Sequence, residues 1–172
     1  MKTKIYIMAM LLFCNGISLA RNNNTVSLGM SFNKMSLGYR YDSEKMPFWA
    51  GAFLGLGNED VNAGFNDFLF GIKIGQPILS FSKSGIYGAL SSGIYVPNNK
   101  YYAAITPFFG VDLGYEFCFG ENGNHILFSE TGYRYGHRDY EQSFENEIIS
   151  INSVDTFELM PFNIILGYGY RF

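Results

Sequence analysis

The sequence predicts an all-β fold, an eight-stranded antiparallel up-and-down transmembrane barrel. Three observations predict it: apolar residues alternate with small or polar ones from residue 26 onward, turn-forming residues separate the alternating runs, and one face of each run is far more apolar than the other. Aromatic residues make up 18% of the 172 residues and charged residues only 16%, which excludes an intrinsically disordered chain. The net charge of -3 argues against a nucleic-acid partner.

The first 20 residues have the pattern of an export signal. Lys2 and Lys4 precede an apolar run at residues 5–13, and Ser18-Leu19-Ala20 forms a small-x-small cleavage site. The apolar run is too short to cross a bilayer. We therefore expect cleavage after Ala20, which leaves one barrel domain over residues 21–172.

The first two strands are predicted at residues 26–32 and 35–41. Apolar residues hold the even positions in the first run and the odd positions in the second. A two-residue hairpin at Asn33-Lys34 explains this change of parity. It would pair Met30 with Leu37, so that like side chains oppose one another.

Six further strands complete the predicted set. The clearest alternation covers residues 68–75, 109–119 and 162–172, and weaker alternation covers 48–56, 86–96 and 125–136. Turn and loop residues are concentrated at 42–47, 57–67, 76–84, 97–100, 120–124 and 137–156. Within the last of these, residues 140–153 are ambiguous and could extend the last two strands beyond the membrane.

The glycines decide which face points inward. A soluble ligand-binding barrel would place the apolar face inside, but an eight-stranded barrel has an interior just wide enough for side chains to fill. Many inward glycines are then needed beside a few long polar residues. Large aromatic residues also gather at both ends of the predicted strands, as in the interfacial girdles of a membrane barrel. An aromatic-rich soluble sandwich is the alternative fold.

The alternating run at residues 164–172 points to a known family of barrels. The export signal, the eight alternating strands and Ile164-x-Leu166-x-Tyr168-x-Tyr170-x-Phe172 resemble the small eight-stranded outer-membrane barrels of Gram-negative-type bacteria, the OmpA/OmpX-like group. The resemblance implies a bacterial outer-membrane location, periplasmic termini and contact with outer-membrane lipid. It also implies that the barrel-assembly machinery reads Tyr168, Tyr170 and Phe172. The Asn33-Lys34 link departs from this group, whose outward loops are usually longer.

With this topology, seven charged residues on the small-residue face would line the lumen. They are Arg40, Lys73, Asp112, Glu116, Glu130, Arg134 and Arg171. Isolated buried charges are costly, so we expect these groups to pair and to plug the barrel. A hairpin about residues 121–123 would also place Glu130 beside Gly114. A proton-relay or catalytic role for this network is the alternative.

Acidic residues dominate the predicted outward loops. They are Glu59, Asp60, Asp67, Asp139, Glu141, Glu145, Glu147 and Asp155, with Arg138 as the only base in the two loops that hold them. Such loops could bind divalent cations beside lipopolysaccharide, or a basic surface partner. Simple solvation of exposed charges is the alternative.

No catalytic or metal-binding pattern stands out. His125 and Ser129 lie four residues apart on a predicted strand, a separation of about 13 Å, which is too far for a hydrogen bond. His137 lies in a predicted outward loop, but the His-x-Ser pattern of the small lipid A deacylases, which this barrel resembles in size, is absent. The sequence has no Cys/His metal spacing and no phosphate loop, so neither a metal nor a cofactor is predicted.

The sequence thus predicts a non-enzymatic outer-membrane barrel with a salt-bridged lumen. It would act as an envelope anchor or as a surface-contact protein through its acidic loops. The alternatives are an outer-leaflet lipid-modifying enzyme that uses His137, and a narrow pore.

Overall fold

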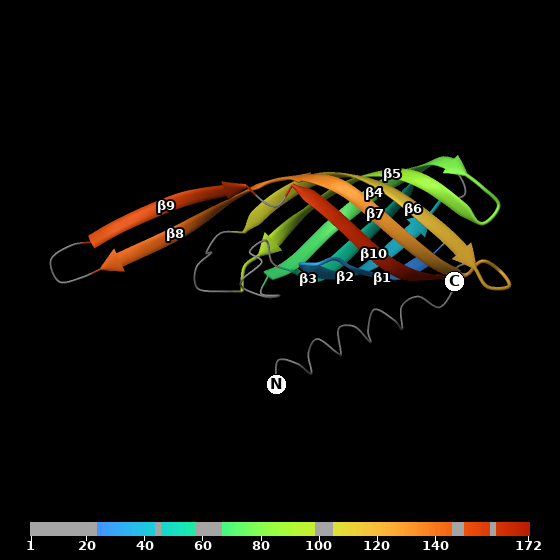
Figure 1. Ribbon diagram of the computed structural model, residues 1–172, viewed down its shortest axis with the longest axis horizontal. Helices are drawn as coiled ribbons and strands as arrows, with labels where there is room; N and C mark the ends of the chain where they lie inside the picture. Colours follow the sequence, from blue (N-terminus) through green and yellow to red (C-terminus); the bar gives the residue numbers. More distant parts are fainter. Residues whose placement is uncertain (1–23, 44–45, 58–66, 99–104, 146–149, 159–160) are drawn as a thin grey trace, which may run out of the picture.

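A computed structural model of the chain contains a closed eight-stranded barrel and a separate two-stranded hairpin (Figure 1). The structure describes residues 24–43, 46–57, 67–98, 105–145, 150–158 and 161–172. The barrel strands are β1 (Asn24–Met30), β2 (Lys34–Asp42), β3 (Trp49–Gly57), β4 (Asp67–Ser80), β5 (Ser84–Val96), β6 (Thr106–Phe119), β7 (His125–Tyr135) and β10 (Phe162–Arg171). Within these ranges no helix is long and apolar enough to cross a membrane.

The closed order of the barrel strands is β1-β10-β7-β6-β5-β4-β3-β2, and every neighbouring pair is antiparallel. This order is an up-and-down barrel, because strands that follow one another along the barrel chain are also neighbours in space. The predicted fold class and all eight predicted strands are confirmed. The predicted export signal lies outside the described residues.

The large apolar side chains point away from the lumen. Ile72 is 59% exposed and Phe162 is 70% exposed, and the same face of every barrel strand carries exposed apolar residues. Such a surface is unfavourable in water and favourable against lipid. The soluble sandwich is therefore excluded, since the chain closes into a barrel whose apolar face is the outer one.

The first hairpin has a different register from the predicted one. Met30 pairs with Met35, and the Ser31 amide donates to the Lys34 carbonyl at 2.8 Å, so the turn is Phe32-Asn33. The predicted Asn33-Lys34 turn is wrong by one position. Moving the turn by one residue shifts each residue's cross-strand partner by two positions. Every side chain then stays on the same face of the sheet, so the alternation could not distinguish the two registers.

The turn predicted at residues 76–84 is also too long. β4 continues to Ser80, and the turn is formed by the residues between Phe81 and Ser84, whose backbone hydrogen bond is 2.7 Å long. A register shift between Pro77 and Leu79 lets the strand continue past proline. Proline cannot donate to a ladder, and irregularities of this kind are where strands tolerate it.

The interior holds aromatic rings as well as charges, which the alternation did not predict. Inward aromatic residues lie directly opposite a glycine on the neighbouring strand: Trp49 faces Gly75, Phe53 faces Gly71, Tyr87 faces Gly114, Phe108 faces Gly93 and Phe128 faces Gly167. Each ring lies over its glycine, because a Cβ built there would fall within 3 Å of the ring. The glycines therefore provide the space that a narrow barrel lacks.

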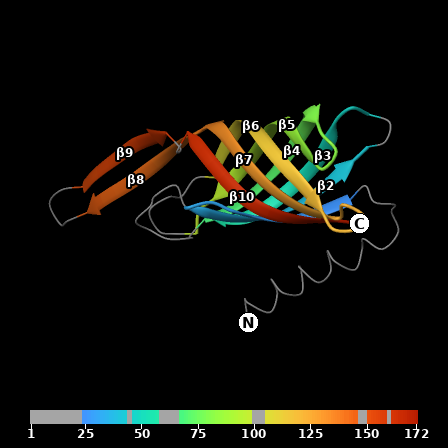
Figure 2. The same cartoon turned by 45° about the vertical axis from the view of Figure 1, so that its right-hand side comes forward.

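The extra hairpin consists of β8 (His137–Glu145) and β9 (Ser150–Glu158) and projects from one end of the barrel (Figures 1 and 2). It continues the ladder between β7 and β10 without a shift, since Tyr133 pairs with Phe162 and His137 pairs with Glu158. A hydrogen bond of 2.6 Å from the Arg134 amide to the Pro161 carbonyl joins the two parts. Most of the loop predicted at residues 137–156 is therefore strand, as the ambiguous stretch at 140–153 allowed.

Candidate functional site

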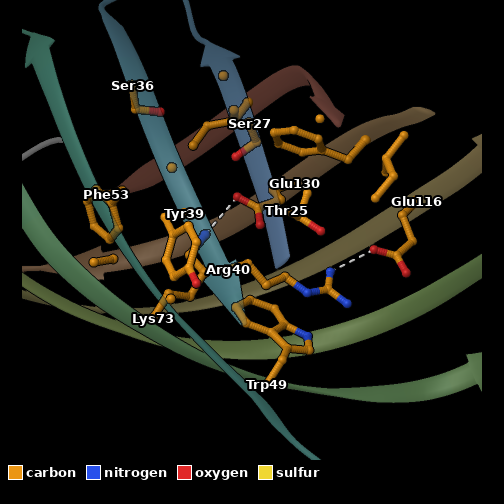
Figure 3. Close-up of a pocket in the computed structure, with 18 of the residues that line it drawn as sticks. Thr25, Ser27, Ser36, Tyr39, Arg40, Trp49, Phe53, Lys73, Glu116 and Glu130 are labelled. Atoms are coloured by element: carbon orange, nitrogen blue, oxygen red, sulfur yellow. Dashed lines mark hydrogen bonds and ion pairs between the residues drawn. The ribbon is translucent and has the colours of Figure 1, made fainter. Parts of the chain in front are cut away.

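Arg40 crosses the lower part of the lumen, near the start of β1 and the end of β10. Its Nη1 donates to Glu116 Oε2 at 2.8 Å, and its Nε donates to Asp42 Oδ1 at 2.9 Å. The guanidinium lies 4.6 Å from the Trp49 ring centroid, which gives a cation–π contact (Figure 3). β2 and β6 are diametrically opposite in the closed strand order, so the Arg40–Glu116 pair spans the lumen.

Lys73 joins two carboxylates in the middle of the lumen. Its Nζ lies 2.7 Å from Glu130 Oε2 and 3.2 Å from Asp112 Oδ2. Tyr87 donates to the other oxygen of Glu130 at 2.6 Å. Glu130 lies directly opposite Gly114, as the hairpin about residues 121–123 predicts. The cation between the two carboxylates offsets their mutual repulsion.

In the upper lumen, the Arg134 side chain contacts aromatic residues. Its Nη1 donates to the Tyr95 hydroxyl at 3.0 Å, and its guanidinium lies 5.0 Å from the Phe108 ring centroid. Tyr95 and Phe108 form a buried cluster with Leu69. In the described part of the chain no carboxylate forms an ion pair with Arg134, in contrast to Arg40 and Lys73.

A buried ion pair connects the base of the hairpin to the barrel wall. Arg138 Nη1 lies 2.7 Å from Asp67 Oδ2, and the two side chains are 3% and 0% exposed. The expectation that Asp67 belongs to an exposed acidic loop is therefore wrong. Arg138 is the second residue of β8, and 71 positions separate it from Asp67, so their contact could not be read from sequence spacing.

The other predicted surface acids are only partly described. Asp139 is exposed and accepts a hydrogen bond of 2.8 Å from the Thr156 hydroxyl across the hairpin. Glu141 and Glu145 lie in β8, and Asp155 lies in β9. Glu59, Asp60 and Glu147 lie outside the described residues.

Both histidines belong to outward aromatic belts. His125 Nδ1 lies 2.6 Å from the Tyr168 hydroxyl at the end of the barrel where β10 ends, and His137 Nε2 lies 2.8 Å from the Tyr135 hydroxyl at the other end. Across the described ranges these hydroxyls are the only side-chain hydrogen-bond partners of the two rings. The geometry therefore provides no Ser-His or His-carboxylate contact there.

The residues of the expected assembly signal lie on β10 and just after it. Tyr168 and Tyr170 are exposed on the outer face, and Phe172 is half-buried. Asn24 and Phe172 exchange backbone hydrogen bonds, which ties the last residue to the first strand and helps to close the barrel. Among the residues the structure describes, no group of three His, Cys, Asp or Glu side chains could hold a metal ion.

Comparisons with known proteins support the fold. No protein-family model matches the sequence, and no curated protein matches it. Among solved structures, the chain is similar to the outer membrane protein AlkL, determined by solid-state NMR in lipid bilayers. The TM-score is 0.55 at 14% sequence identity, over 90% of this chain and 93% of AlkL. The fold is thus that of the small eight-stranded outer-membrane barrels.

Proposed function

We propose that the chain is a non-enzymatic outer-membrane protein whose plugged barrel anchors the β8–β9 hairpin at the cell surface. Contacts made by this hairpin and by the acidic outward loops then carry its function. The proposal rests on one structural arrangement. Ion pairs cross the lumen, and the hairpin continues the hydrogen-bond ladder of the barrel. The similarity to AlkL, an outer membrane protein, supports the location.

The filled lumen argues for an anchor rather than a narrow pore. Arg40 meets Glu116 across the full width of the barrel, and Lys73 meets Glu130 above them. A solute could pass only if such pairs opened, and removing one partner of a buried pair costs about 3–5 kcal/mol. Between the ion pairs and the small residues of β1 and β2, the lumen keeps a cavity of only about 100 Å³.

The base of the hairpin is held by contacts with the barrel. The unshifted ladder and the Arg138–Asp67 ion pair hold its base against the barrel. The sequence of residues 137–158 contains six acidic residues and one arginine, so a basic surface partner or divalent cations are the expected ligands. The other partners of the protein would be outer-membrane lipid and the barrel-assembly machinery, with Tyr168, Tyr170 and Phe172 as the assembly signal.

The test is a hairpin deletion that leaves the barrel intact. Residues 139–156 are replaced by an Asn-Gly turn, which suits a two-residue hairpin. Boiled and unboiled samples are compared by gel migration to show that the barrel still folds. Binding of a decalysine peptide and of Ca²⁺ is then measured by calorimetry with the protein in nanodiscs.

We expect the deletion variant to fold and to lose the binding that the full chain shows. A matched variant with Asp139→Asn and Glu141→Gln keeps the hairpin and removes two charges, so it should bind more weakly without losing the fold. If the full chain binds neither probe, or if the deletion leaves binding unchanged, surface contact through the hairpin is refuted.

A further inference from the structure

A second cavity lies at the opposite end of the barrel from the hairpin, beside the end of β10. Its volume is about 220 Å³, and it is bordered by residues of β2, β3 and β6, by Arg171 of β10, and by the β4–β5 turn. In the proposed topology this end faces the periplasm. The cavity therefore has no part in the surface contacts proposed above.

Two residues that border this cavity carry buried hydrogen-bond donors that have no acceptor among the described residues. The side chain of Trp49 is 5% exposed, and its indole Nε1 is buried with no hydrogen-bond partner in the described part of the chain. Figure 3 shows the indole nitrogen on the side of the ring that faces Glu116 and the Arg40 guanidinium. Arg171 Nε is likewise buried and without a partner among the described residues. A buried donor without an acceptor is costly, so these groups favour a ligand that accepts hydrogen bonds.

The charge around the cavity is also unbalanced. Three cations border it, Arg40, Lys83 and Arg171, against one carboxylate, Glu116. Arg40 is satisfied by Glu116 and Asp42, whereas neither Lys83 nor Arg171 forms an ion pair with a carboxylate in the ranges that the structure describes. The cavity thus has two cations available for an anion.

The number and kind of donors favour a phosphate group over a smaller anion. Ser80 and Ser82 border the cavity together with Lys83 and Arg171, and these residues carry hydroxyl, ammonium and guanidinium donors. Lysine, arginine and hydroxyl donors together match the several oxygens of a phosphate group, and arginine binds it with directed hydrogen bonds.

We propose that this cavity at the periplasmic mouth of the barrel binds a phosphate group, with Lys83 and Arg171 as the charged ligands and Trp49 Nε1 as a buried donor. The phosphate belongs either to a soluble ion or to the headgroup of a phospholipid. Both sources offer the same chemistry to the site, and the experiment below separates them.

Trp49 is the only tryptophan of the chain, so its fluorescence reports on the cavity directly. The mature protein is folded in octyl glucoside, whose headgroup contains no phosphate, and titrated with sodium phosphate at constant ionic strength against sodium chloride. In a parallel arm, fluorescence is compared between nanodiscs of phosphatidylglycerol and nanodiscs of an uncharged galactolipid.

Lys83 provides the matched variants, because its side chain is exposed in the turn and its substitution should not disturb the fold. We expect Lys83→Gln to weaken the saturable response roughly threefold to tenfold, and Lys83→Arg to retain it. Gel migration of unboiled samples checks that each variant is folded.

The two arms assign the source of the phosphate. A saturable response to inorganic phosphate supports a soluble ligand, and a response to phosphatidylglycerol alone supports a lipid headgroup. The proposal is overturned if neither arm responds, if chloride reproduces the response, or if Lys83→Gln binds as tightly as the parent protein.

Discussion

Gly114→Ala tests whether the inward aromatic rings depend on the glycines beneath them. A Cβ at Gly114 would lie 2.1 Å from Tyr87 Cζ and 2.5 Å from its hydroxyl oxygen. Both distances are far below van der Waals contact, so the ring must move by about 1 Å or more. Tyr87 packs edge-on against Trp49 at 5.5 Å and donates to Glu130 at 2.6 Å, and a displaced ring would lose both contacts.

The cost of this substitution can be estimated from its two parts. Overpacking a well-filled interior costs about 1–3 kcal/mol. Loss of a hydrogen bond to a charged group costs about 1.5–3 kcal/mol. We therefore expect Gly114→Ala to lower the free energy of unfolding by about 2.5–6 kcal/mol when both parts apply.

The measurement is equilibrium urea unfolding in detergent micelles, followed by Trp49 fluorescence and by gel migration. Gly88→Ala is the matched control, because Gly88 is the residue next to Tyr87 and its added Cβ would lie 3.3 Å from the flexible end of Ile78. The control should change stability by less than about 1 kcal/mol. Equal stability losses in the two variants would refute the argument that the rings need glycine as a partner.

Three further predictions follow from the ion pairs and the histidines. Asp67→Asn removes the negative charge that faces the buried Arg138 guanidinium, so it should lower the free energy of unfolding by about 3–5 kcal/mol. It should also make the hairpin more sensitive to limited proteolysis, and unchanged cleavage would contradict the idea that the ion pair holds the hairpin in place. The parent protein should show no steady conductance in planar bilayers, whereas the double variant Arg40→Ser and Glu116→Ser should show openings; stable channels in the parent would support the pore alternative. His137→Ala should leave the mass profile of lipid A unchanged in cells that express the protein, and an altered profile would favour the enzyme alternative.

The sequence determined the strands and their faces and predicted the pairing of β6 with β7, whereas the predicted register of the first hairpin was wrong by two residues. A strand repeats every two residues, so alternation from residue 26 onward places the apolar side chains together on one face whatever the register. A short turn then brings adjacent residues into pairs, which is why the sequence alone predicts that Glu130 lies beside Gly114. The export signal and the assembly signal remain predictions.

Only the tertiary structure decided which residues meet across the lumen. Arg40 of β2 reaches Glu116 of β6 because barrel closure sets these two strands on opposite sides of the lumen, and Arg138 of the separate hairpin reaches Asp67 at the start of β4. The same closure buries Trp49 and Tyr87 on the inner face, where alternation alone indicates only small and charged residues. Alternation is a local property of each strand. Contacts across a barrel depend on the stagger of all the strands together, and the spacing of residues within one strand does not specify that stagger.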